Sequence, residues 1–181
     1  MKKEDAYMLE KFRPDIYQNS IYDIPYKKLK RRGIKCLLFD LDNTIASLNT
    51  LEPDSKFLDF IYKLQDDGFK IIILSNASKA RVTPFKEQAN IDSSYHSMKP
   101  LKKKYQKIMK LYHYKDTDIA CIGDQLLTDV LGANRMGITS ILVNPISNDD
   151  HILTKIARFF EKRIFKKLKK KGLLEKGVYY D

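Results

Sequence analysis

Two acidic residues, Asp40 and Asp42, stand two positions apart directly after an apolar segment. Alternate residues of an extended strand point to the same side, so both carboxylates can face one site. One could attack phosphorus while ionised, and the other could exchange a proton with the leaving group. The spacing therefore indicates phosphoryl chemistry, although Asp-x-Asp alone is common and also occurs where two acids face water before a turn.

Other polar residues follow apolar segments further along the chain. Ser75 and Asn76 end one such segment, Asp124 ends another with Asp129 shortly after it, and Lys99 precedes Pro100. Taken singly, these residues are typical of a turn, a helix N-cap or a solvated lysine. Together they can form a metal site, because Asp124 from a neighbouring strand can join Asp40 around one cation. Hard carboxylate oxygens favour Mg²⁺ in that position, and Lys99 supplies a positive charge.

The elements that must position these residues alternate along the chain. Four apolar runs too short for helices predict buried parallel strands at 36–42, 70–76, 118–124 and 139–145. Helical patterns lie between them, at 53–68, from Pro100 onward and at about 128–136. This alternation predicts an α/β fold with a mainly parallel central sheet. In such sheets ligands bind beyond the carboxyl ends of the strands, where the polar residues stand.

These segments resemble the four ordered motifs of haloacid-dehalogenase-like (HAD) phosphatases. The motif residues are Asp40-Leu-Asp-Asn-Thr44, Ser75-Asn76, Lys99-Pro100 and Gly123-Asp-Gln-Leu-Leu-Thr-Asp129, and they span most of residues 36–145. With Phe12-Arg13-Pro14-Asp15 upstream and Gly132-Ala-Asn-Arg-Met-Gly137 downstream, the chain most resembles the YqeG family of subfamily IIIA. That family is similar to mitochondrial phosphatidylglycerophosphatases. The resemblance implies a Rossmann-like three-layer sandwich. No large cap domain is expected, because the gaps after Thr44 and between Ser75 and Lys99 are short.

The resemblance also implies a role for each motif residue. Asp40 would form an aspartyl-phosphate, while Asp42 would protonate the leaving oxygen and later activate water. Ser75, Asn76, Lys99 and Thr44 would hold the phosphoryl group or the loop around it. Asp124 would bind Mg²⁺ with Asp40 and the Asp42 carbonyl, and Asp129 would be a further ligand or a support.

The positive charge of the chain lies mainly at its two ends. Residues 1–35 carry a net charge of +5 and residues 151–181 carry +7, whereas residues 36–150 carry −1. We expect a basic N-terminal extension at 1–35, the catalytic domain at 36–150, and a basic amphipathic helix with a tail at 151–181. Basic flanks favour an anionic partner, although charge runs are often only solvated surface.

The C-terminal segment combines an apolar stripe with nine basic residues between Lys155 and Lys171. Such a helix either packs on the domain or lies on a membrane surface, and residues 152–171 would then make the membrane contact. RNA binding is a third interpretation. The stripe consists of Leu153, Ile156, Phe160, Ile164 and Leu168.

An open site and basic flanks favour a bulky anionic substrate. Combined with the similarity to phosphatidylglycerophosphatases, these features lead us to expect a Mg²⁺-dependent phosphomonoesterase acting on an anionic phospholipid, and the resemblance makes phosphatidylglycerophosphate the first candidate. The alternatives are a phosphatase of soluble esters such as nucleotide or sugar phosphates, and an RNA- or ribosome-associated binding module with incidental turnover. No apolar run has the length of a membrane-spanning helix or the form of a signal peptide, so the expected location is cytoplasmic, with contact at the inner membrane face. The sequence leaves the oligomeric state open.

Overall fold

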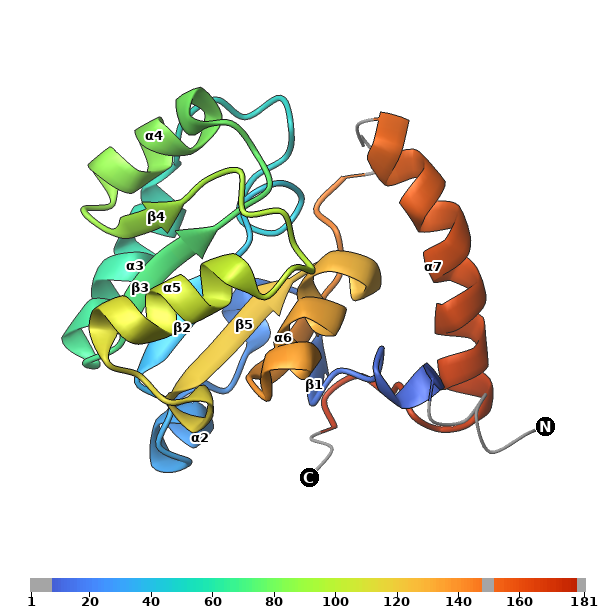
Figure 1. Ribbon diagram of the computed structural model, residues 1–181. Helices are drawn as coiled ribbons and strands as arrows, with labels where there is room; N and C mark the ends of the chain where they lie inside the picture. Colours follow the sequence, from blue (N-terminus) through green and yellow to red (C-terminus); the bar gives the residue numbers. More distant parts are fainter. Residues whose placement is uncertain (1–7, 148–151, 179–181) are drawn as a thin grey trace.

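The computed structural model describes residues 8–147 and 152–178 and contains one six-stranded parallel sheet (Figure 1). The strand order is β1-β6-β5-β2-β3-β4. The strands are β1 (Ile16–Gln18), β2 (Cys36–Phe39), β3 (Lys70–Leu74), β4 (Asp92–Ser94), β5 (Ile119–Gly123) and β6 (Thr139–Val143). The helices are η1 (Ile21–Asp23), α2 (Tyr26–Arg31), α3 (Ser55–Asp66), α4 (Lys79–Gln88), α5 (Lys103–Tyr112), η2 (Asp116–Asp118), η3 (Leu126–Val130), α6 (Leu131–Met136) and α7 (Ile152–Lys170).

The predicted α/β architecture is confirmed. Each of the four predicted strands is present, as β2, β3, β5 and β6, and these four form the centre of the sheet. The two strands that the sequence did not predict, β1 and β4, are three residues long and lie at the two edges. β1 belongs to the segment expected to be an N-terminal extension, and it pairs with β6 in the same sheet.

Alternation along the strands gives the sheet two apolar faces. Leu37 and Phe39 of β2 face a cluster that includes side chains of α2, α3 and α4. Cys36 and Leu38 face the opposite cluster, which includes side chains of α5 and α6. The result is the predicted three-layer sandwich. Residues 40–102 contain two helices and two strands between β2 and α5, and no separate cap domain.

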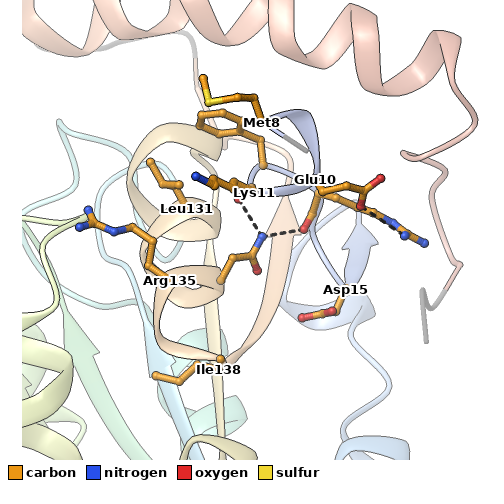
Figure 2. Close-up of a pocket in the computed structure, with 11 residues that line it drawn as sticks. Met8, Glu10, Lys11, Asp15, Leu131, Arg135 and Ile138 are labelled. Carbon is orange, nitrogen blue, oxygen red and sulfur yellow. Dashed lines mark hydrogen bonds and ion pairs between the residues drawn. The ribbon is translucent and has the colours of Figure 1, made fainter. Parts of the chain in front are cut away.

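Residues upstream of β1 are tied to the body of the molecule. The Asn134 side chain on α6 donates hydrogen bonds to the carbonyls of Lys11 and Arg13, at 2.9 and 2.8 Å. The Asp15 carboxylate accepts from the backbone N–H of Ser140 on β6, at 2.7 Å. A pocket of about 890 Å³ lies between this segment and α6 (Figure 2). The two outlying motifs of the sequence, 12–15 and 132–137, are thus in contact.

Helix α7 lies along one side of the molecule, beside the edge of the sheet that β1 and β6 form (Figure 1). Leu168 is fully buried in a cluster with Leu126, Val130 and Leu142. Phe160, on the predicted stripe, is 52% exposed instead. The stripe residues Leu153 and Ile156 lie outside the described side chains. None of the described helices has both the length and the apolar character needed to span a membrane.

Candidate active site

The predicted site residues follow the carboxyl ends of adjacent strands. Asp40 comes directly after β2, and its N–H donates to the Ile122 carbonyl of β5 at 2.8 Å. Asp124 comes directly after β5. Because β5, β2 and β3 are neighbours in a parallel sheet, their ends meet at one edge.

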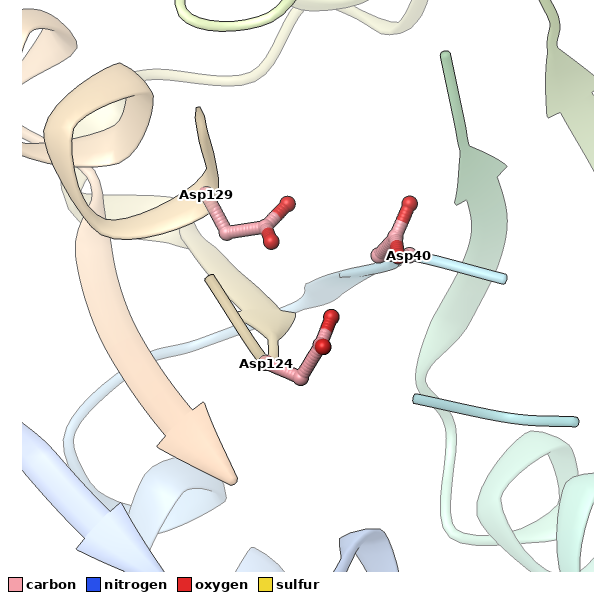
Figure 3. A group of neighbouring side chains, drawn as sticks. All are labelled: Asp40, Asp124 and Asp129. Atoms are coloured by element: carbon pink, nitrogen blue, oxygen red, sulfur yellow. The ribbon is translucent and has the colours of Figure 1, made fainter. Parts of the chain in front are cut away.

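Three buried carboxylates meet at this edge. Asp40, Asp124 and Asp129 each offer an oxygen atom, and these atoms lie within 4.8 Å of one another (Figure 3). Asp129 comes from the helical turn η3 and approaches the backbone of Gly123 closely. A Cβ atom at Gly123 would lie 2.1 Å from Asp129 Cγ, so only glycine leaves room for this carboxylate.

Lys99 lies between two of these acids. Its Nζ atom is 2.6 Å from Asp40 Oδ1 and 2.6 Å from Asp129 Oδ1, and its side chain is almost fully buried. Burial works to lower the pKa of Lys99, but the carboxylates of Asp129 and Asp40 outweigh it and raise the pKa above its ordinary value. Lys99 is therefore charged at neutral pH.

Burial has the opposite effect on the acids. Removal from water raises the pKa of Asp40 to about 6, although Lys99 opposes the shift. Burial, with the nearby charges of Asp40 and Asp129, raises the pKa of Asp124 to about 8 against the opposing effect of Arg158. A divalent cation bound among these crowded carboxylates would stabilise their ionised forms, because its positive charge attracts them.

Asn76 and Ser75 shape the loop that carries Lys99. The Asn76 side chain accepts from the Lys99 N–H at 2.8 Å and donates to the Lys99 carbonyl at 3.3 Å. The Ser75 hydroxyl accepts from the N–H of Ala77 at 3.1 Å, and the Ser75 carbonyl accepts from Ser97. Thr44 is buried, and its hydroxyl donates to Asp124 Oδ1 at 3.1 Å. Asn76 thus contacts Lys99, a predicted phosphate-binding residue, and Thr44 contacts Asp124, a predicted metal ligand.

Asp42 is held by a residue that the sequence did not indicate. Arg81 Nε lies 2.9 Å from Asp42 Oδ1, and the same guanidinium donates to the Ser47 carbonyl at 2.9 Å. Arg81 stands in the first turn of α4, whose N-cap Ser78 accepts from the Arg81 N–H. Nothing in the local sequence marks this arginine, because its partner lies 39 residues away.

Two residues of α7 also reach the site without a sequence signal. Arg158 forms an ion pair with Asp124, and Glu161 accepts from the N–H of Leu127 at 2.8 Å. Periodicity predicted the helix, but it could not show which of the nine basic residues faces the acids.

The acids open onto a cleft of about 760 Å³. It is bordered by the ends of β2 and β3, the start of α4, the Lys99 loop and Ala157 of α7. Among the predicted site residues, Asp40, Asp42, Ser75, Asn76 and Lys99 line this cleft. Asp124 and Asp129 stand beside Asp40, and Thr44 lies behind Asp124.

This set of side chains fits a divalent cation. All three clustered groups are carboxylates, the ligand type that Mg²⁺ prefers, and they come close without any histidine or thiolate among them. Lys99 and Arg158 partly balance the negative charge of these carboxylates.

Comparison with known proteins identifies relatives over nearly the whole chain. Residues 7–147 match the family model described as mitochondrial PGP phosphatase. "Probable phosphatase YqeG" of Bacillus subtilis (strain 168) is 37% identical over 169 residues, covering 93% of this chain and 98% of that protein.

More distant matches agree with this result. The chloroplastic/mitochondrial phosphatidylglycerophosphate phosphatase 1 of Arabidopsis thaliana is 22% identical over 175 residues, which cover 88% of this chain and 49% of that protein. A HAD family enzyme of Bacteroides thetaiotaomicron, solved as a magnesium complex, superposes with a TM-score of 0.51 at 13% identity. It covers 67% of this chain and 98% of its own, and it shows the same fold.

Proposed function

Because this chain belongs to the mitochondrial PGP phosphatase family and is a phosphatase of the HAD type, we propose that it hydrolyses phosphomonoesters with Mg²⁺ through an aspartyl-phosphate on Asp40. The observation that carries the proposal is the meeting of three buried carboxylates with Lys99 at the edge of an open cleft. The magnesium complex of the Bacteroides relative adds support for the choice of cation.

The proposed reaction has two steps. An Asp40 oxygen attacks phosphorus, the bond from phosphorus to the ester oxygen breaks, and Asp42 gives its proton to the departing alcohol. Asp42 then takes a proton from water, which attacks the aspartyl-phosphate and releases inorganic phosphate from Asp40. Lys99 stabilises the negative charge on the phosphoryl oxygens, and Arg81 keeps Asp42 in the cleft. A cation held by Asp40, Asp124 and Asp129 would supply further stabilisation of that charge.

Phosphatidylglycerophosphate is the proposed substrate, bound while α7 rests on an anionic membrane. Three features support a large substrate at a surface: residues 40–102 form no cap domain over the cleft, exposed lysines crowd α7, and the Arabidopsis relative is named for this lipid. Burial of Leu168 favours a second candidate, in which α7 is a structural helix and the substrate is a soluble phosphate ester.

A phosphate-release assay separates these candidates. We expect Mg²⁺-dependent release from phosphatidylglycerophosphate in mixed micelles, and much weaker release from nucleotide and sugar phosphates. Asp40→Asn should abolish release from every substrate while the protein stays folded. Release from soluble esters alone would reject the lipid assignment, and activity of Asp40→Asn would reject the nucleophile.

A further inference from the structure

Arg158 binds the same carboxylate that the proposed metal site needs. One guanidinium nitrogen pairs with Asp124 Oδ2, and the other donates to the Asp124 backbone carbonyl at 3.0 Å. The Asp124 side chain is fully buried, whereas Arg158 is 18% exposed and reaches it from α7. Asp124 Oδ1 already accepts from Thr44, so both oxygens of this carboxylate have donors.

A cation and this guanidinium oppose each other at the carboxylate of Asp124, because each is a positive charge bound to the same group. A magnesium ion lies about 2.1 Å from its ligand oxygens, while a guanidinium donor lies about 2.8 Å from the carboxylate that it contacts. Two positive groups would then face each other within a few ångströms in a site shielded from water, where charge repulsion is strong. Thr44 is neutral and does not create this conflict.

Two parts of α7 whose side chains the structure describes are held by different kinds of contact. Leu168, near the C-terminal end, is buried among apolar side chains. The part that carries Arg158 is held by polar contacts, from Arg158 to Asp124 and from Glu161 to Leu127, while Phe159 and Phe160 between them are more than half exposed. Arg158 can therefore leave Asp124 without breaking the apolar contact that fixes the helix.

We infer that Arg158 and a divalent cation compete for the carboxylate of Asp124, so that the docking of α7 sets the affinity of the site for the cation. The inference rests on the proposed metal site. Lys99 and Arg81 also pair with acids of the cleft, but both lie within residues 75–102. Arg158 differs from them because it comes from a separate C-terminal helix that also borders the cleft through Ala157.

Magnesium binding to the full chain, measured by calorimetry, tests the inference. If Arg158 occupies Asp124 in nine molecules out of ten, Arg158→Gln should bind Mg²⁺ roughly tenfold more tightly than the unchanged protein. Arg163→Gln is the matched control, because it removes the same charge from the same helix at a residue that stacks on Phe159. It should bind Mg²⁺ like the unchanged protein.

Hydrogen exchange supplies a second readout that does not depend on the variant. Adding Mg²⁺ to the unchanged chain should speed amide exchange in residues 157–161, while β2 stays protected. Equal affinities for Arg158→Gln and the unchanged chain, weaker binding by Arg158→Gln, or slower exchange in 157–161 would overturn the competition and leave the proposed function standing. No Mg²⁺ binding by any of the three proteins would overturn the metal site, and the inference with it.

Discussion

Lys99 is the positive charge on which two buried acids depend. It contacts Asp40 and Asp129 at 2.6 Å each, and all three side chains are almost fully buried. A buried ion pair adds little net stability over an apolar pair, but removal of one partner leaves an uncompensated charge behind. The stability of the metal-free protein should therefore be sensitive to this one residue.

Lys99→Met should lower the free energy of unfolding by about 3–5 kcal/mol at pH 7, because it leaves Asp40 and Asp129 without their cation. Urea denaturation without divalent ions measures this loss. Lys103→Met, at an exposed position of α5, is the control and should change stability by less than about 0.5 kcal/mol. Equal urea midpoints for the two variants would show that Lys99 does not compensate the acids.

The sequence predicted the acids and Lys99 but not their basic partners. Asp40, Asp42 and Lys99 stand at strand ends or before proline, so their position in the chain gives a local signal. Arg81 and Arg158 have no such signal, because each meets its acid only after the chain has folded, across 39 and 34 residues. In the sequence, Arg81 and Arg158 look like ordinary residues of predicted helices. Only the tertiary fold brings these two arginines to the acids of the site.

Among the elements, the central strands were predictable and the edge strands were not. β2, β3, β5 and β6 are mainly apolar, because both faces of the sheet are covered by helices. β4 reads Asp-Ser-Ser and has no apolar residue, so only its pairing with β3 makes it a strand. The turn η3 was expected as part of an α-helix, but it is a π-helical turn, and Asp129 within it lies close to Gly123.

Gly123→Ala tests that close approach between β5 and η3. The added methyl group would lie 2.1 Å from Asp129 Cγ, so the carboxylate must move away from Lys99 and from the proposed cation. We expect stability to fall by about 1–3 kcal/mol and Mg²⁺ affinity to fall roughly 10- to 100-fold. Urea denaturation and calorimetry measure the two effects.

Gly132→Ala is the matched control for this variant. Its methyl group would lie 2.5 Å from the Tyr105 hydroxyl, which also strains the packing but does not touch the three acids. It should lose stability and keep its Mg²⁺ affinity. If both variants bind Mg²⁺ like the unchanged protein, Asp129 does not take part in holding the ion.

The C-terminal end of helix α7 should contribute to the stability of the folded protein, because it packs on the rest of the molecule. Leu168→Ala removes a fully buried side chain and should cost about 2–5 kcal/mol of unfolding free energy. Phe160→Ala removes a larger side chain that is half exposed, and should cost far less. Urea denaturation compares the two, and a smaller loss for Leu168→Ala than for Phe160→Ala would contradict the packing of this end.

At the scale of the whole molecule, positive charge is separated from the catalytic body. The net charge is +11, yet residues 36–150 carry −1, so attraction to an anionic surface would come from the two ends of the chain. Both ends contact the body, through Asn134 at one and Leu168 at the other. A membrane that attracts α7 would therefore also bring the cleft beside Ala157 close to its surface.

Vesicle binding tests this orientation through the exposed lysines of α7. Each basic residue near an anionic surface contributes about 1 kcal/mol, so reversing the charge of Lys166, Lys167 and Lys170 to Glu should weaken co-sedimentation with phosphatidylglycerol-containing vesicles on the order of 100-fold or more. The same reversal at the exposed Lys102, Lys103 and Lys107, in and just before α5, changes the net charge equally and should have a much smaller effect. Binding of the unchanged protein should fall steeply as salt rises, because salt screens exposed charges. If both triple variants lose binding equally, attraction comes from net charge and α7 does not orient the cleft.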